Sequence, residues 1–155
     1  MRVASVDVTV SGRSTPLIIS LFIAGLAIVS GIFVYKSITA DASHVILGGK
    51  YFHAEVASTP MTREQGLSNR EKLAADKAMV FVFDAAGTQC FWMRDMKFAI
   101  DIVWLDEQNR VSSVERRVGP STYPRSFCHD AKHVLEFNAG TVDQLKVKVG
   151  DQVDL

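Results

Sequence analysis

The chain has 155 residues, of which 48% are hydrophobic, and its 17 basic and 17 acidic side chains cancel to a net charge of zero. This balance excludes nucleic acid as an expected partner, because such binding depends largely on neutralising phosphates. The length suffices for one domain with its own hydrophobic core after an N-terminal portion that is not globular.

The first expected element is a membrane-spanning helix. Residues 17–35 read LIISLFIAGLAIVSGIFVY and contain no charged side chain. At about 1.5 Å per residue, such a helix spans roughly 28 Å, close to the thickness of the hydrocarbon core of a bilayer. We therefore expect a short head over residues 1–14, a transmembrane helix or signal anchor over 15–36, and contact of residues 17–35 with membrane lipid.

The position of this segment also predicts where the remaining residues are located. A short head before a long C-terminal domain favours a single-pass membrane protein whose C-terminal domain is extracytoplasmic. Ala40-Asp41-Ala42 matches the small-residue pattern of a signal-peptide cleavage site, so secretion after cleavage near Ala42 stays open as the alternative. Both interpretations deliver the residues after Ala42 beyond the cytoplasm.

The rest of the chain reads as short strands separated by turns. A linker over 37–49 leads to a globular domain over 50–155. A short helix is expected from Pro60, with Thr59 as its N-cap and Gly66 ending it, and Thr141–Leu145 reads as a helical turn. Turns are expected at 84–87 and 106–109 and a loop at 119–124. Strands are expected at 50–57, 79–83, 90–93, 100–105, 110–118, 133–137 and 150–155. About seven strands and little helix predict a mainly β fold of the α+β type, mainly antiparallel.

Several blocks of sequence follow one another in a specific order. They are Arg63–Arg70 (REQGLSNR), Met79–Phe83 (MVFVF), Phe91–Arg94 (FWMR), Ile100–Ile102 (IDI), Val134–Glu136 (VLE), Gly140 and Gly150-Asp151. The series resembles family 192 of the domains of unknown function, from about residue 52 to residue 155, with departures at Ser68, Ala78, Asp95-Met96 and Ala99. The resemblance implies a compact, antiparallel β-barrel-like domain with one or two short helices, often exported. It implies no established reaction.

Cys90 and Cys128 are the only cysteines of the chain. Two cysteines in an exported domain predict one disulfide, here between the strand that enters the FWMR block and the loop before the last strands. Closing a loop of about 39 residues would stabilise the fold by roughly 4 kcal/mol in the chain-entropy model. Two free buried thiols are the alternative.

The tentative ligand-binding residues surround Trp92. A tryptophan ring beside hydrogen-bonding side chains suits a sugar, whose ring face is apolar and whose rim is polar. We expect Trp92 to line a cleft in which Arg94 and Asp101 orient a polar ligand. In the alternative, the aromatic ring belongs to the core and the charges form a rim.

Asp101 and Glu136 are acidic residues within apolar strands. Burying an unpaired carboxylate is costly, so Arg63 or Arg70 is the expected partner of Asp101. If Asp101 and Glu136 faced one cavity, they could form an acid/base pair of the kind used in glycoside hydrolysis. These residues complete the tentative ligand-binding set, which is Trp92, Arg94, Asp101, Arg63, Arg70 and Glu136.

The sequence offers no recognisable catalytic set, cofactor motif or metal site. His129 and His133 are four residues apart but lack a third ligand in the pattern. We expect a non-catalytic, membrane-anchored, extracytoplasmic binding or accessory module for a cell-envelope polar ligand such as a saccharide. The alternatives are a hydrolase using Asp101 or Glu136, and a structural partner of another envelope protein through exposed strand edges.

Overall fold

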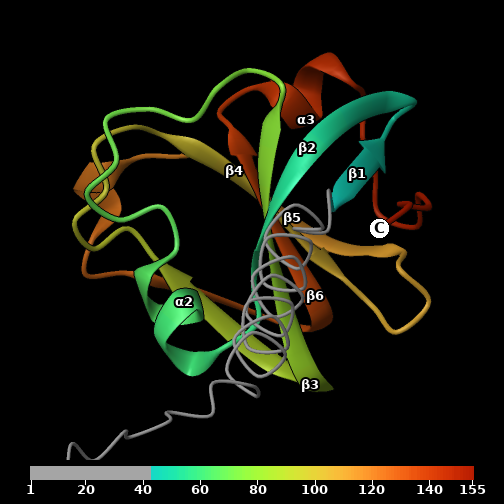
Figure 1. The fold of residues 1–155 in the computed structure, drawn as a ribbon, viewed down its shortest axis with the longest axis horizontal. Coiled ribbons are helices and arrows are strands. Elements are labelled where there is room, and N and C mark those ends of the chain that lie inside the picture. Colours follow the sequence, from blue (N-terminus) through green and yellow to red (C-terminus); the bar gives the residue numbers. More distant parts are fainter. Residues whose placement is uncertain (1–42) are drawn as a thin grey trace, which may run out of the picture. The chain divides into compact units, whose positions relative to one another are not determined.

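A computed structural model of the chain describes residues 43–155 (Figure 1). The predicted transmembrane helix at 17–35, the cleavage site near Ala42 and residues 37–42 of the predicted linker lie outside this range. Those predictions are therefore untested. Within residues 43–155, no helix is long and apolar enough to cross a membrane.

The described residues form one six-stranded sheet in the order β1-β2-β3-β6-β4-β5. The strands are β1 (His44–Leu47), β2 (Lys50–Ala57), β3 (Lys77–Trp92), β4 (Ile100–Leu105), β5 (Val111–Val118) and β6 (Ser126–Asn138). The mainly β prediction is confirmed, with one departure from antiparallel pairing, because β2 and β3 run parallel. The segment assigned to a linker, 37–49, is wrong in its second half, since it contains β1.

The predicted closed, barrel-like arrangement is wrong, because β1 and β5 are the two edges of the sheet and do not pair with each other. The C-terminal segment lies between them instead. It makes single bridges from Asp154 to Ile46 of β1 and from Gln152 to Arg110 beside β5. The final strand predicted at 150–155 is therefore reduced to isolated bridges that cover parts of both edges.

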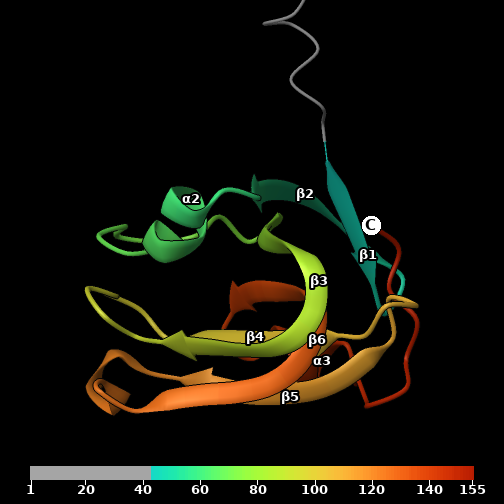
Figure 2. The ribbon, with the colours of Figure 1, turned by 90° about the horizontal axis from the view of Figure 1, so that it is seen from below.

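Strands β3 and β6 are longer than predicted and bend together (Figure 2). The turn expected at 84–87 is wrong. The register shifts there, with Val82 opposite His133 and Gly87 opposite Ala131, so the extra residues of β3 bulge out of the ladder. Lys132 fixes the bulge by donating from Nζ to the carbonyl of Asp84 at 2.8 Å. Such a bulge bends the paired strands while keeping them one continuous element.

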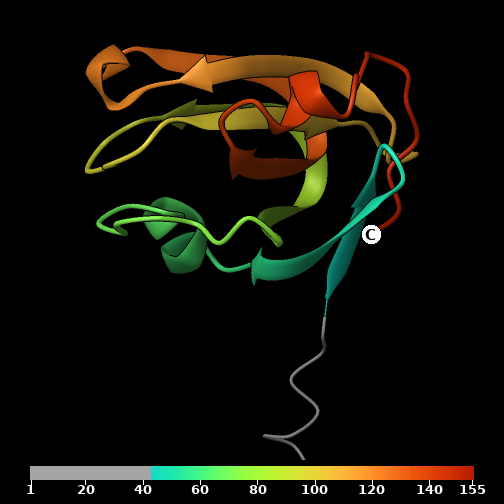
Figure 3. The same ribbon diagram turned by 90° about the horizontal axis from the view of Figure 1, so that it is seen from above.

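Two short helices and a 3-10 turn complete the domain. They are α2 (Pro60–Gln65), α3 (Thr141–Gln144) and η1 (Pro120–Thr122). The predicted start of α2 is confirmed: the Thr59 hydroxyl accepts from the Thr62 amide at 3.2 Å, and Pro60 occupies the first turn. This reciprocal cap satisfies amides that a helix of six residues could not pair internally. Helix α3 lies close to β4 and β5, away from α2 (Figure 3).

The sheet carries a hydrophobic core on each face. All six residues of β4 are buried. Because successive side chains of a strand point to opposite faces of the sheet, both faces must be covered at β4. Val103 and Leu105 enter the first core with Phe137, while Ile102 and Trp104 enter the second core with Val134. Each acidic side chain on these strands therefore has to meet one core or the other.

Candidate functional site

A pocket with several aromatic walls lies on the face that carries the second core. Its volume is about 310 Å³, and its walls come from α2 with the turn that follows, from β3, and from β6. Aromatic side chains form most of the apolar wall, and amide, hydroxyl and charged groups surround them. The aromatic residues are Phe81, Phe83, Phe91 and Trp92, and the polar ones are Arg63, Glu64, Gln65, Ser68, Gln89 and Glu136. The size and this mixture are typical of small-molecule sites.

Gly66 brings the end of α2 against the aromatic wall. It caps the helix at φ 48°, a left-handed conformation, and its amide donates to the Thr62 carbonyl at 3.0 Å. A Cβ atom on Gly66 would lie 3.2 Å from Cζ of Phe81. Glycine is therefore required both by the backbone conformation and by the close approach that shapes this side of the pocket.

Glu136 contributes a buried carboxyl to the pocket. The residue is 5% exposed, and its Oε2 atom has no hydrogen-bond partner among the described residues. Burial raises the pKa of this carboxyl from its ordinary 4.5 to about 8, although Arg70 acts in the opposite direction by favouring the charged form. At neutral pH the group is therefore mainly a neutral carboxylic acid, able to donate one hydrogen bond and accept others.

Arg63 and Arg70, both predicted ligand residues, occupy different positions. Arg63 lines the pocket, but its Nη1 donates to the backbone carbonyls of Ser58 and Val82, and its guanidinium lies 5.1 Å from the Phe83 ring centre. Arg70 forms an ion pair with Glu55 at 2.8 Å and is not among the residues lining the pocket. The structure thus brings Arg63, but not Arg70, to the pocket wall.

Trp92 and Arg94 lie together at the edge of the pocket. Trp92 lines it and is 40% exposed, and the Arg94 guanidinium lies 5.4 Å from the centre of the Trp92 ring. Arg94 also pairs with Glu64 of α2 at 3.0 Å, and that partner raises the pKa of its guanidinium. The expected neighbourhood of Trp92 and Arg94 is therefore present, and the tryptophan ring is accessible to a ligand.

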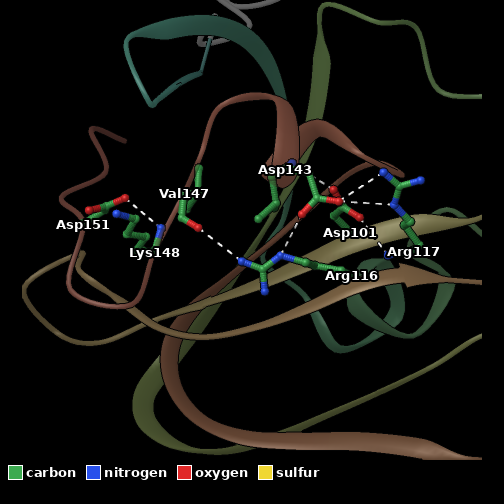
Figure 4. A network of polar contacts seen from close by, with 8 residues as sticks. Asp101, Arg116, Arg117, Asp143, Val147, Lys148 and Asp151 are labelled. Atoms are coloured by element: carbon green, nitrogen blue, oxygen red, sulfur yellow. Dashed lines mark hydrogen bonds and ion pairs between the residues drawn. The ribbon is translucent and has the colours of Figure 1, made fainter.

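Asp101 lies elsewhere, in the polar network beside α3 (Figure 4). Its carboxylate accepts hydrogen bonds from the Arg117 amide at 2.8 Å and from the Val142 amide at 2.9 Å. The predicted ion pair with Arg63 or Arg70 is wrong, because two backbone donors satisfy the buried charge instead. This arrangement fastens β5 and α3 to β4, so the contacts of Asp101 within the described domain are structural.

The predicted disulfide joins Cys90 and Cys128. The two cysteines face each other across β3 and β6, so Cys128 lies in a strand rather than in the loop that we expected. Both residues are exposed, and Cys90 borders the pocket two residues before Trp92. The bridge thus fixes the pair of strands that carries part of the pocket wall.

Several pocket residues were not predicted. Gln65, Ser68 and Gln89 are polar and belong to no recognised motif of a binding site, while Phe81 and Phe83 belong to the apolar strand predicted at 79–83. Gly66, within the REQGL segment, is the one local signal that the end of α2 packs closely against another part of the domain. Within residues 43–155, no group of three or more His, Cys, Asp or Glu side chains is placed to hold a metal ion.

Comparisons with known proteins place this domain in a family. Residues 43–155 match the model of DUF192, described as Uncharacterized ACR. A protein of unknown function from Novosphingobium aromaticivorans is 27% identical, with a TM-score of 0.67 over 72% of this chain and 82% of its own. A candidate transcription regulator from Sinorhizobium meliloti is also 27% identical, with a TM-score of 0.66 over 72% of this chain and 89% of its own. No curated protein matches the chain. With 113 consecutive residues matched, the predicted resemblance is confirmed and the chain belongs to the DUF192 family.

Proposed function

We propose that this protein is a membrane-anchored, extracytoplasmic binding module that holds an uncharged polar ligand, such as a cell-envelope saccharide, in the pocket beside Trp92. The observation that carries the proposal is the carboxyl of Glu136. A buried polar atom without a partner is rare in folded domains, because leaving it unsatisfied costs about 1–3 kcal/mol. A ligand that supplies the missing hydrogen bond recovers this cost.

The charges around the pocket favour an uncharged ligand. The lining contains three ionisable side chains, Arg63, Glu64 and Glu136. Arg63 is engaged by two backbone carbonyls, Glu64 is neutralised by Arg94, and Glu136 is mainly protonated at neutral pH because its pKa is about 8. A charged ligand would enter this aromatic pocket without a free counter-ion, which makes its desolvation costly.

Sugar rings fit the remaining chemistry. The exposed ring of Trp92 offers a flat apolar surface, and the side chains of Ser68, Gln65 and Gln89 offer hydrogen-bonding groups beside it. Such a combination of an aromatic face and a polar rim suits a ring with an apolar face and peripheral hydroxyl groups. An acetamido sugar adds a carbonyl oxygen that can accept from protonated Glu136.

The location is argued from the sequence and the disulfide. Residues 17–35 are uncharged and long enough to span a bilayer. The bridge between Cys90 and Cys128 favours an oxidising compartment, where exposed disulfides persist. Fusions of the full chain at Leu155 to alkaline phosphatase and to β-galactosidase test this in a bacterial host. We expect an active phosphatase and an inactive galactosidase, and the reverse pattern would exclude the extracytoplasmic location.

Ligand binding is tested with the full-length chain in lauryldimethylamine oxide, a detergent without a sugar headgroup, under oxidising conditions. Calorimetric titration compares N-acetylglucosamine with glucuronate. We expect binding of the uncharged sugar, a loss of at least about tenfold in affinity in Trp92→Ala, and none in Tyr51→Ala. Tyr51 is the matched control because it is 47% exposed, much like Trp92, and does not line the pocket. Preference for glucuronate, or an equal effect of both variants, would contradict the proposal.

The alternatives have less support. A hydrolase using Asp101 together with Glu136 needs both carboxyls in one cavity, whereas Asp101 bonds backbone amides beside α3 and Glu136 lines the pocket. Partnership through open strand edges is disfavoured because the C-terminal segment bridges both β1 and β5. One similar structure is described as a candidate transcription regulator. A chain of zero net charge gives no electrostatic support for the nucleic-acid binding that such a role would need.

A further inference from the structure

A second hollow begins on the other side of Trp92. It has a volume of about 200 Å³ and is lined by Trp92, Arg94, Tyr123, Pro124 and Ser126. These residues come from the end of β3 and the segment that follows it, from the segment after η1, and from the first residue of β6. We refer to this second hollow as the Tyr123 groove.

The pocket and the Tyr123 groove share one residue and lie next to each other. Trp92 lines both, and it pairs with Ser126 across the ladder of β3 and β6. The ion pair between Glu64 and Arg94 links their rims, since Glu64 lines the pocket and Arg94 lines the groove. A molecule bound in the pocket and long enough to pass Trp92 would therefore reach the Tyr123 groove.

The groove offers the same chemistry as the pocket in a more open form. Tyr123 is 50% exposed and Trp92 is 40% exposed, so two large aromatic side chains that line the same groove are accessible to a ligand. Ser126 provides a hydroxyl between them, and Arg94 provides donors beyond those that hold Glu64. Aromatic surfaces separated by polar groups suit consecutive sugar rings, each with its own apolar face.

Resting on the proposed function, we propose that the ligand is an uncharged oligosaccharide of at least two rings, one seated in the pocket and the next in the Tyr123 groove. Trp92 separates the two positions and contacts both rings. The pocket is the less open of the two hollows and would hold the end of the chain, whereas the more open groove would allow the saccharide to continue. The protein would then bind a chain end of an envelope glycan rather than a free monosaccharide.

The test compares ligand lengths in three uncharged series: β-1,4-linked N-acetylglucosamine, β-1,4-linked glucose and α-1,4-linked glucose. Each is titrated calorimetrically as monomer, dimer and tetramer into the full-length chain in lauryldimethylamine oxide. In at least one series, we expect the dimer and tetramer to bind at least about tenfold more tightly than the monomer. Tyr123→Ala should abolish this gain while leaving monomer affinity unchanged, and Tyr123→Phe should retain it. Trp92→Ala should weaken the monomer and weaken the dimer at least as much, and Tyr51→Ala should change neither.

The outcomes separate the two proposals. Equal affinity for monomer and dimer, or a gain with length that survives in Tyr123→Ala, overturns the two-ring site but leaves the pocket as a saccharide site. Absence of binding in every series overturns the proposed function, and the two-ring site with it. The melting temperature of each variant, measured without ligand, shows whether a loss of binding comes from a loss of folding.

Discussion

Asp101 and Glu136 project from opposite faces of two neighbouring strands. Asp101 of β4 lies opposite Phe137 of β6, whereas Glu136 lies opposite Ile102, one position along the same ladder. Residues that face each other across a ladder share a face of the sheet, and successive residues alternate. One carboxyl therefore satisfies backbone amides beside α3, and the other lines the pocket.

The ionisation of Glu136 should make stability depend on pH. Its pKa is raised from 4.5 to about 8, so between these values the folded protein holds a proton that the unfolded chain has released. The contribution of the protonated Glu136 carboxyl to stability is therefore fully present below about pH 4.5. It decreases as the pH rises towards 8. Arg70 is the charged neighbour that opposes this shift, and Arg63 and Glu64 line the same pocket.

Glu136→Gln removes this titration while keeping the size of the side chain. From about pH 5 to about pH 8, the free energy of unfolding of the wild-type protein should fall by roughly 3 kcal/mol more than that of the variant. Urea unfolding of both proteins across this range measures the difference. If the free energies of unfolding of the two proteins changed with pH in parallel, the carboxyl of Glu136 would already be ionised in the folded protein at neutral pH.

Asp101→Ala should destabilise the domain by about 3–5 kcal/mol, because it removes the acceptor of the buried Val142 amide and of the partly buried Arg117 amide. Asp143 provides the matched control, since it pairs with both Arg116 and Arg117 in the same network but is 44% exposed (Figure 4). Asp143→Ala should cost less than about 1 kcal/mol. Chemical denaturation of both variants gives the comparison, and similar losses would contradict a structural role of the Asp101 carboxylate.

Gly66→Ala should both destabilise the domain and weaken ligand binding. The new Cβ would meet Phe81 at 3.2 Å in a left-handed backbone conformation. Gly49 is the matched control, because it also has a positive φ, +77°, but nothing lies within 4 Å of its Cβ position. We expect a cost of about 1 kcal/mol in Gly49→Ala and about 2–3 kcal/mol in Gly66→Ala. Equal melting temperatures of the two variants would rule out the steric contribution of Phe81.

Reduction of the Cys90–Cys128 disulfide should lower stability by about 4 kcal/mol, since it frees a loop with a sequence separation of 38. Both cysteines are exposed, so a phosphine reductant should reach the bridge without unfolding the protein. Guanidinium unfolding with and without reductant measures the loss. The double variant Cys90→Ala/Cys128→Ala should unfold like the reduced protein and show no response to reductant.

Local patterns were sufficient for some features of this protein. The residues at 100–105 indicated a strand, and Thr59 with Pro60 indicated the start of α2. The number of cysteines left one possible intramolecular pairing, and the ordered motifs indicated the family over residues that its model matches. These features depend on neighbouring residues or on composition, which the sequence displays directly.

Predictions from local sequence patterns were wrong where segments distant in the chain pair with the residues concerned. The segment Asp84-Ala85-Ala86-Gly87 resembles a turn, but β6 offers a continuous pairing partner on both sides of it, so the segment becomes a bulge inside β3. Arg63 or Arg70 was expected to meet Asp101, yet Arg70 pairs with Glu55 at 2.8 Å and Arg63 donates to backbone carbonyls. Both outcomes depend on which strand lies alongside, which the local sequence does not contain.

The sequence by itself determined that acidic residues would be buried in the strands, because Asp101 and Glu136 each sit within an apolar run. Tertiary structure alone decided what each carboxyl meets. Asp101 reaches the amide of Val142, 41 residues further along the chain, while Glu136 meets the aromatic wall of the pocket without a partner for Oε2. The physical reason is that strand register assigns each side chain to one face, and a shift of one position exchanges the two environments.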